Sequence, residues 1–250
     1  MDPIRIYYFT RYCEVGASSR IRAYQYFDFL EQKGFKIQIS PLLDRDYLFL
    51  LYDRKRYDIR AVLRGILRRI RELRLLKGYD LIWIEKELFP WFPSVVERFF
   101  LAGIPYILDY DDAVYHNYDL HPRGTVRRFL GKKIDTIMAG AAIVIVGNDY
   151  LAQRARDAGA RRLEILPSVV DLSKFPGIQE KTREAPFTIG WIGSPSTAKH
   201  LPEVEAALKE VCRNRGGKVV LVGARENPFI GLMATIRDWD ETTETEEIGN

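Results

Sequence analysis

Short apolar runs alternate with longer amphipathic segments through the first two thirds of this sequence. The apolar runs are residues 4–9, 35–40, 81–84, 106–108, 143–146 and 165–166. The segments 19–33, 93–102 and 149–158 have helical periodicity, and a glycine follows each of them. Strands that alternate with helices of this length predict a parallel sheet, because parallel strands need crossover connections. The sequence therefore predicts a doubly wound α/β domain over residues 1–170.

The rhythm lapses at residues 171–186, which read DLSKFPGIQEKTREAP. Two prolines, a glycine and mixed charges in this segment predict a linker. Residues 187–250 then begin a second unit, with strands expected at 188–192 and 218–222, a helix at 201–214, and one more strand at 234–239. An open parallel sheet needs helices on both faces. A unit with two or three strands has too few connecting helices to cover both. The second Rossmann-like domain is therefore expected to be incomplete.

Composition excludes several classes of protein. The net charge of +4, from 38 basic and 34 acidic residues, is too small to indicate a nucleic-acid partner. Cys13 and Cys212 lie far apart without CxxC spacing, and the three histidines lack HExxH spacing, so neither a disulfide framework nor a metal site is predicted. The sequence lacks a signal peptide and an 18-residue apolar span. We expect a cytoplasmic protein that is soluble or peripheral on the inner membrane face.

The segment from Arg54 to Lys77 is unusually basic, with ten basic and two acidic residues. Apolar residues spaced three and four apart predict one amphipathic helix over residues 52–77, with its stripe at Ile59, Leu63, Ile66, Ile70 and Leu73. One interpretation is a solvated helix packed on its own core. The other is contact with an anionic membrane surface, where each basic residue contributes about 1 kcal/mol.

Two predicted strand-to-helix turns have phosphate-binding character. The first contains Gly16, Ser19 and Arg20, and the second is the turn Gly193-Ser194 with Lys199 shortly after it. Glycine lets a backbone approach a ligand, and N–H groups at a helix start favour anions. A glycine after a strand is more often a tight turn than a ligand site, and neither turn matches GxGxxG or GxxxxGK[ST]. Ligands of open α/β sheets bind at the carboxyl ends of strands, so two such domains predict a ligand cleft between them.

Carboxylates follow the predicted strand 106–108 at the same kind of edge. Asp109, Asp111 and Asp112 are placed to act as a general base or to bind a sugar hydroxyl, or else they form a solvated turn or a helix cap. Glu85 and Glu87 follow the strand 81–84 in a similar position, so the aspartates are not unique. Aromatic residues such as Trp91, Trp83 and Trp191 could stack on sugars, but hydrophobic packing is the simpler expectation.

Three segments carry a resemblance to a known family. They are SSRIRAYQYFDFLEQKGF, YILDYDDAV, and IVGNDYLAQRARDAGARRLEILPSVVDLSKF followed by IGWIGSPSTAKHL. In this order and spacing, they resemble the retaining glycosyltransferases of family 4, also called glycosyl transferases group 1, which have the GT-B fold. The resemblance covers nearly the whole chain. It implies a UDP- or GDP-sugar donor held mainly by the second domain and a sugar or lipid-linked acceptor held mainly by the first, in cell-envelope or polysaccharide synthesis.

The resemblance also implies roles for individual residues. Gly16 falls in the family's first glycine-containing loop, near the donor phosphates. Lys199 matches the basic residue that neutralises the leaving diphosphate, and Gly193 and Ser194 form the turn before it. Asp111 and Asp112 fall where many members keep a polar catalytic-loop residue near the sugar. Such enzymes generally need no divalent metal or other cofactor.

The sequence departs from this family at its end. Family members are typically longer and carry a later glutamate-rich motif that binds the nucleotide ribose and the sugar, whereas this chain ends at ETTETEEIGN. We therefore expect the 250-residue chain alone to bind donor poorly and to be inactive. The alternative is a non-catalytic fragment that binds an acceptor or a membrane surface. A nicotinamide-dependent oxidoreductase is disfavoured, because GxGxxG is missing.

Overall fold

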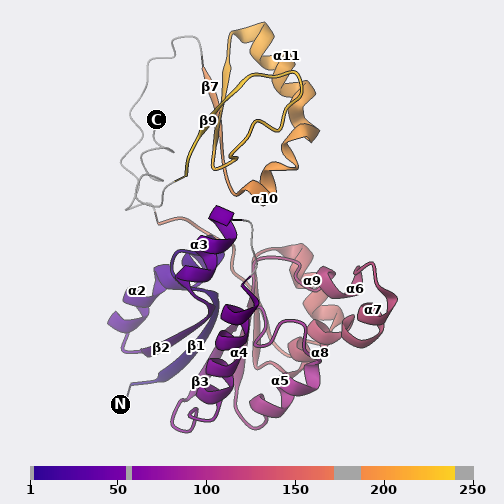
Figure 1. The fold of residues 1–250 in the computed structure, drawn as a ribbon. Helices are drawn as coiled ribbons and strands as arrows, with labels where there is room; N and C mark the ends of the chain where they lie inside the picture. The colour runs from indigo at the N-terminus through magenta and orange to yellow at the C-terminus, as the bar shows by residue number, and fades with distance from the viewer. Residues whose placement is uncertain (1–2, 55–57, 172–186, 240–250) are drawn as a thin grey trace. The chain divides into compact units, whose positions relative to one another are not determined.

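The computed structural model describes residues 3–54, 58–171 and 187–239. The chain divides into two compact units, Met1–Val170 and Asp171–Asn250 (Figure 1). The predicted linker at 172–186 and the acidic end at 240–250 lie outside the described residues. Within the described part, no helix is both long enough and apolar enough to cross a membrane.

Unit 1 contains a six-stranded sheet in the order β2-β1-β3-β4-β5-β6. Every neighbouring pair of strands in this sheet is parallel. The strands are β1 (Arg5–Tyr12), β2 (Lys36–Leu43), β3 (Leu81–Glu85), β4 (Tyr106–Tyr110), β5 (Ile143–Val146) and β6 (Leu163–Ile165). The predicted α/β fold with a parallel sheet is therefore confirmed.

Helices cover both faces of this sheet. They are α1 (Ala17–Arg22), α2 (Phe27–Gln32), α3 (Arg45–Arg54), α4 (Ile59–Leu73), α5 (Ser94–Leu101), α6 (His116–Asp119), α7 (Gly124–Leu130), α8 (Lys133–Gly140) and α9 (Asp149–Asp157). The chain moves one way along the sheet from β1 to β2 and the other way afterwards, so right-handed crossovers place α1 and α2 on one face and α4, α5, α8 and α9 on the other.

Two apolar cores follow from this arrangement. Alternate strand residues such as Phe9, Ile84 and Leu108 point to the core shared with α4, α5, α8 and α9. Tyr8 points to the opposite face, where Phe27 of α2 and Trp83 of β3 pack against it. The rings of Tyr8 and Trp83 stack with centroids 5.1 Å apart, so Trp83 contributes to packing as expected.

The predicted helix over residues 19–33 is interrupted. Ala23 has φ −127° and ψ −69°, and a short 3₁₀ turn at Tyr24–Tyr26 separates α1 from α2. The side chain of Arg22 enters the carboxyl edge of the sheet, whereas Phe27 packs beside Tyr8. A straight helix could not satisfy both contacts, which periodicity alone does not reveal.

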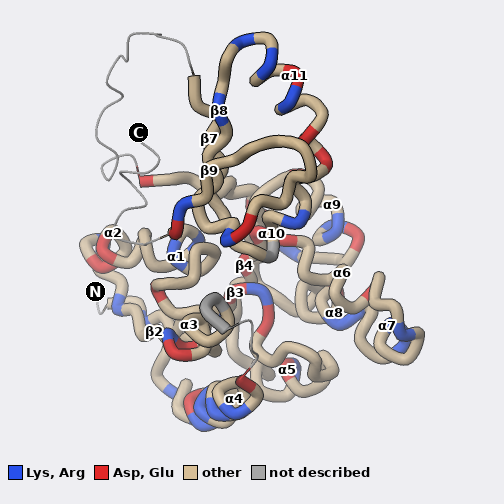
Figure 2. Tube along the Cα trace, turned by 45° about the horizontal axis from the view of Figure 1, so that its top comes forward, with Lys and Arg blue, Asp and Glu red and all other residues tan. Residues whose placement is uncertain are grey.

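The prediction of one helix over residues 52–77 is wrong. Helix α3 ends at Arg54, residues 55–57 lie outside the described part, and α4 begins at Ile59. The Asp58 carboxylate caps α4 by accepting the backbone N–H groups of Arg60 and Ala61 at 2.9 and 3.2 Å. Figure 2 shows how densely the basic residues lie along α4.

The predicted apolar stripe of this helix also divides. Ile66 and Leu73 are buried, but Ile59 and Leu63 are 70% and 53% exposed. A β-carbon at Gly65 would lie 2.1 Å from the Leu42 carbonyl oxygen, so the glycine lets α4 approach β2 closely on this side. The close approach fixes which side of the helix faces the sheet and leaves the first two apolar turns outside.

Unit 2 contains a smaller parallel sheet in the order β7-β8-β9. Its elements are β7 (Thr188–Ile192), α10 (Pro195–Ala198), the 3₁₀ helix Leu201–Val204, α11 (Glu205–Arg215), β8 (Lys218–Val222) and β9 (Ala234–Arg237). A small core forms around Val219, Leu221 and Phe229. Unit 2 therefore repeats the strand-helix alternation of unit 1 from β7 to β8, whereas residues 223–233 join β8 to β9 without a helix.

Candidate functional site

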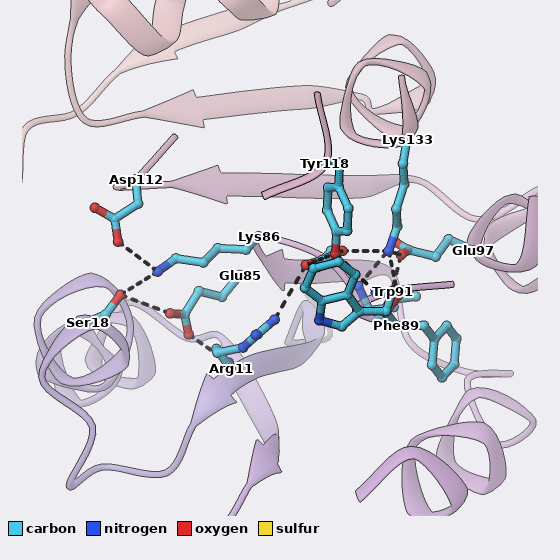
Figure 3. Close-up of polar contacts among 12 residues, drawn as sticks. Arg11, Ser18, Glu85, Lys86, Phe89, Trp91, Glu97, Asp112, Tyr118 and Lys133 are labelled. Carbon is cyan, nitrogen blue, oxygen red and sulfur yellow. Dashed lines mark hydrogen bonds and ion pairs between the residues drawn. The ribbon is translucent and has the colours of Figure 1, made fainter. Parts of the chain in front are cut away.

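The carboxyl ends of β1, β3 and β4 carry a cluster of polar side chains. Because these strands are parallel neighbours, the residues that end or follow them meet at one edge of the sheet. Glu85 ends β3 opposite Asp109 of β4, and both residues are 1% exposed. The loop after β1 leads into α1 and brings two serines to the same edge. We call Ser18, Ser19, Glu85, Lys86, Asp111 and Asp112 the edge cluster. Figure 3 labels four of them, Ser18, Glu85, Lys86 and Asp112.

Glu85 fixes the loop between β1 and α1. Its carboxylate accepts the Ser19 hydroxyl at 2.6 Å, the Ser18 hydroxyl at 3.2 Å and the Arg11 backbone N–H at 2.8 Å. The loop turns tightly at Gly16, where a β-carbon would lie 2.4 Å from Cβ of Tyr12. Glycine is therefore required for the turn, and the buried Ser19 side chain serves the loop itself.

Lys86 joins the two sides of the edge cluster. Its ammonium lies 2.9 Å from Asp111 Oδ1, 3.0 Å from Ser18 Oγ and 3.4 Å from Asp112 Oδ2. The backbone of Lys86 has φ +65°, in the left-handed region that side chains rarely adopt. Strain of this kind persists where the surroundings fix it, and it clusters at functional sites. Burial alone would lower the pKa of Lys86, but the carboxylates of Asp111 and Glu85 raise it.

The two aspartates of the edge cluster have different environments. Asp111 accepts the Ser18 hydroxyl at 2.5 Å and pairs with Lys86, and its side chain is 17% exposed. Burial favours its neutral form, but Lys86 and Ser18 outweigh this effect and lower the pKa of Asp111. The Asp112 side chain is 72% exposed. Asp111 is therefore committed to its partners, whereas Asp112 can reach a bound molecule.

A buried ion pair lies below the edge cluster. The Arg22 guanidinium donates to Asp109 Oδ1 through Nε at 2.9 Å, with Nη2 2.8 Å from the same oxygen. It also donates to the Leu166 carbonyl at 2.6 Å, beyond the end of β6. Both side chains are 2% exposed. Burial raises the pKa of Asp109 to about 7, against the opposing effect of Arg22.

A second group of charges involves the loop that follows β3, residues 86–93, which we call the β3 loop. Glu87 accepts the Tyr118 hydroxyl at 2.8 Å, the Lys133 ammonium at 2.5 Å and the Arg11 guanidinium at 3.5 Å. Lys133 also pairs with Glu97 at 2.9 Å, and both of these side chains are fully buried. Burial raises the pKa of Glu97 despite the opposing charge of Lys133. We call Glu87, Glu97, Tyr118 and Lys133 the Glu87 group. It holds the β3 loop to α5 and α8.

Several residues predicted from the sequence therefore meet. Gly16, Ser19, Asp111 and Asp112 lie at one edge of the sheet, and Arg20 follows on α1, with its backbone N–H donating to the Gly16 carbonyl at 2.9 Å. The sequence did not predict Lys86 and Arg22 as members of this region. Their signal was weak, since only the neighbourhood of Glu85 at a strand end pointed to Lys86.

The remaining candidates lie in unit 2. Gly193 follows β7, Ser194 is the residue before α10, and Lys199 follows α10 with an exposed side chain. The Gly193 backbone N–H donates to the Val222 carbonyl at 3.1 Å, and a β-carbon at Gly223 would lie 2.2 Å from the Gly193 carbonyl oxygen. The two glycines let the turns after β7 and β8 pack directly against each other.

Comparison with known protein families gives no match. Comparison with curated proteins gives none either. Solved structures do match. Sucrose-phosphate synthase from Thermosynechococcus elongatus is 15% identical, with a TM-score of 0.58 over 88% of this chain. A glycosyltransferase from Rickettsia africae ESF-5 is 12% identical, with a TM-score of 0.55 over 97%. An alpha-glucosyltransferase in complex with UDP and a 13-mer DNA containing a HMU base is 14% identical, with a TM-score of 0.53 over 98%.

This chain spans only part of these proteins. The match covers 62% of the sucrose-phosphate synthase chain and 70% of each of the other two. At identities this low, the likeness concerns the fold. Together with the parallel six-stranded sheet of unit 1, it shows that this chain has an α/β fold of the GT-B type found in glycosyltransferases.

Proposed function

We propose that this chain belongs to a nucleotide-sugar-dependent glycosyltransferase that acts with retention and without a metal ion. The observation that carries the proposal is the edge cluster, in which the Lys86 ammonium contacts both Ser18 and Asp111. The site lies at the carboxyl ends of parallel strands, where α/β folds bind ligands. The structural likeness to glycosyltransferases supports the same function.

In this proposal, the donor is a UDP- or GDP-sugar and the acceptor is a sugar or a lipid-linked sugar. Gly193, Ser194 and Lys199 bind the diphosphate. The acceptor hydroxyl oxygen forms a bond to the anomeric carbon while the bond from that carbon to the phosphate oxygen breaks. Negative charge then grows on the leaving diphosphate, and the Lys199 ammonium stabilises it.

The two aspartates take separate roles. Asp112, with its exposed carboxylate, binds a substrate hydroxyl and accepts its proton. Asp111 has a lowered pKa and is already hydrogen-bonded to Ser18, so it is a weak base and instead holds Lys86 in place. Ser19 likewise acts by shaping the loop, since its hydroxyl donates to Glu85.

Calorimetric titration of the chain with UDP- and GDP-sugars tests this proposal. We expect binding that Lys199→Ala weakens about 10- to 100-fold, because a hydrogen bond to a charged group contributes about 1.5–3 kcal/mol. Lys218→Ala, an exposed lysine of β8, is the matched control and should bind normally. Release of UDP or GDP in the presence of acceptor would then establish transfer. A folded chain that binds none of the donors would contradict donor binding by this chain alone and would favour the non-catalytic alternative.

Helix α4 favours a second candidate function, binding to an anionic membrane surface on the cytoplasmic side. Ile59, Leu63 and Leu67 form an exposed stripe four residues apart, with exposed fractions of 70%, 53% and 66%. Arg60, Arg64 and Arg68 follow them in register along the helix. Aliphatic side chains beside a row of guanidinium groups suit the interface of anionic lipids.

Sedimentation with vesicles tests this second function. Vesicles containing phosphatidylglycerol should retain the chain at low salt, and pure phosphatidylcholine vesicles should not, because basic residues attract anionic lipid. Leu63→Ser and Arg64→Ser should each reduce the bound fraction, whereas Phe29→Ser on α2, at a residue 56% exposed, should not. Equal binding of all three variants would show that α4 does not contact the vesicles.

A further inference from the structure

Trp91 is exposed at the end of the β3 loop, next to the Glu87 group. Its exposed fraction is 53%, although the neighbouring Leu88 and Phe89 are 0% and 1% exposed. Trp91 is therefore not a residue of the hydrophobic core. Its backbone has φ +67°, which is an outlier for a bulky residue. A strained backbone that presents an aromatic ring to solvent indicates a binding role more than a folding role.

The surroundings fix the plane of the Trp91 ring. Its backbone N–H donates to the Tyr118 hydroxyl oxygen at 3.1 Å, and its indole meets the Tyr118 ring edge-on, with centroids 5.2 Å apart and planes at 74°. The His121 ring meets the indole in the same manner at 5.7 Å and 79°. Tyr118 is anchored in turn by its hydrogen bond to Glu87. The indole is thus held before any ligand arrives.

Arg11 connects this ring to the edge cluster. Its backbone N–H donates to Glu85, and its guanidinium lies 3.5 Å from Glu87 and is 24% exposed (Figure 3). The oxygens of Glu87 already accept Tyr118 and Lys133. Arg11 therefore supplies partly exposed hydrogen-bond donors between Trp91 and the edge cluster.

We infer that Trp91 and Arg11 form a saccharide-binding subsite, with the indole as the platform for a sugar ring. A pyranose ring has an apolar C–H face and a rim of hydroxyl groups. A fixed aromatic ring matches the face, and a charged donor beside it matches the rim. The assignment of this sugar to the acceptor rests on the proposed glycosyltransferase function. A sugar on Trp91 would lie beside the Glu87 group, which Arg11 connects to Glu85 of the edge cluster.

Titration with saccharides alone tests the subsite without any donor. Maltose, lactose and chitobiose would be added to the full chain, and the fluorescence of Trp91 would be isolated by subtracting the signal of Trp91→Phe. At least one disaccharide should give a saturating change, with a dissociation constant on the order of millimolar. Saturation-transfer NMR should detect the same binding, reduced at least tenfold in Trp91→Ala and retained in Phe99→Ala, an exposed aromatic of α5. Sorbitol, which has no ring, should give no change.

Trp91→Gly separates binding from folding. Glycine adopts φ +67° without strain, so this variant should melt at the same temperature as the native chain or higher. It should nevertheless lose saccharide binding. A lower melting temperature together with unchanged saccharide binding would show that Trp91 serves the fold, and would overturn the inference.

The remaining outcomes distinguish the two proposals. Saccharide binding that is equal in Trp91→Ala and the native chain, or absent for all three disaccharides, overturns the subsite. Donor binding in the calorimeter would leave glycosyl transfer standing in that case. Saccharide binding through Trp91 without donor binding supports the subsite and counts against transfer.

Val95 and Phe99 are exposed at intervals of four residues from Trp91. If Trp91→Ala lowered only the binding of anionic vesicles, Trp91 would be a lipid anchor and the subsite would be wrong.

Discussion

The Lys86 ammonium lies 2.9 Å from Asp111 Oδ1 and donates a hydrogen bond to the Ser18 hydroxyl oxygen. The same hydroxyl donates to Asp111. This relationship closes a ring of contacts between the first turn of α1 and the residues that follow β3 and β4. Removing Lys86 leaves the Asp111 carboxylate partly buried without its counter-charge. The ring therefore makes the stability of the chain depend on a region that is also its candidate site.

Lys86→Ala should destabilise unit 1 by about 3 kcal/mol, because it leaves the Asp111 carboxylate buried without its counter-charge. Urea unfolding measures the loss. Lys36→Ala, at an exposed lysine of β2, is the control and should change little. Asp111→Asn should cost less in the Lys86→Ala background than in the native chain, by about 1–3 kcal/mol. Additive costs would mean that the two charges do not interact.

The acid limb of stability should depend on Asp111. Its pKa in the folded state lies below the ordinary value of about 3.9, so its contribution is fully present above that pH. The contribution is lost as the pH falls through the folded-state pKa. Asp111→Asn should therefore lower the free energy of unfolding at pH 7 and flatten its decline below about pH 4. Glu31→Gln, an exposed change on α2, should leave the native curve in place.

Arg22→Met should destabilise the chain in a pH-dependent manner. At about pH 8, Asp109 is ionised in the native chain, so the variant must either keep an unpaired buried carboxylate or take up a proton, at a cost of about 3–5 kcal/mol. The pKa of Asp109 is about 7 even beside Arg22, and it rises further without the guanidinium. At about pH 5 the carboxyl is then neutral, so the cost should shrink. Urea unfolding at both pH values tests this, with Arg156→Met on the exposed side of α9 as control. A cost that grows towards pH 5 would contradict the assignment.

Gly16→Ala should disturb the site through sterics alone. The new β-carbon would lie 2.4 Å from Cβ of Tyr12 and 2.9 Å from its Cγ, so the loop must shift at a cost of about 1–3 kcal/mol. Donor affinity should fall with it if the loop approaches the diphosphate. Gly124→Ala at the start of α7 meets its nearest atom at 3.6 Å and should be tolerated. Thermal unfolding and donor calorimetry on both variants make the comparison.

The class of fold could be predicted from the sequence alone. Apolar runs separated by segments of helical period predict parallel strands with crossovers, because hydrophobic periodicity is a local property that the chain carries into any environment. The ends of β3 and β4 follow from the same pattern, which is why Asp111 and Asp112 could be expected at one edge. The short range of these signals also explains why β7 and β8 were placed correctly at 188–192 and 218–222.

Which of these residues contact one another depends on how the chain folds in three dimensions. Arg22 reaches Asp109 across 87 positions, and Ser19 reaches Glu85 across 66, so no local pattern contains either contact. The same holds for α4, where the approach of Gly65 to Leu42 selects the buried side and leaves Leu63 in solvent. Periodicity states that a helix has an apolar stripe. The partners that the fold brings to it decide how much of that stripe is covered, because burial depends on contacts between distant parts of the chain.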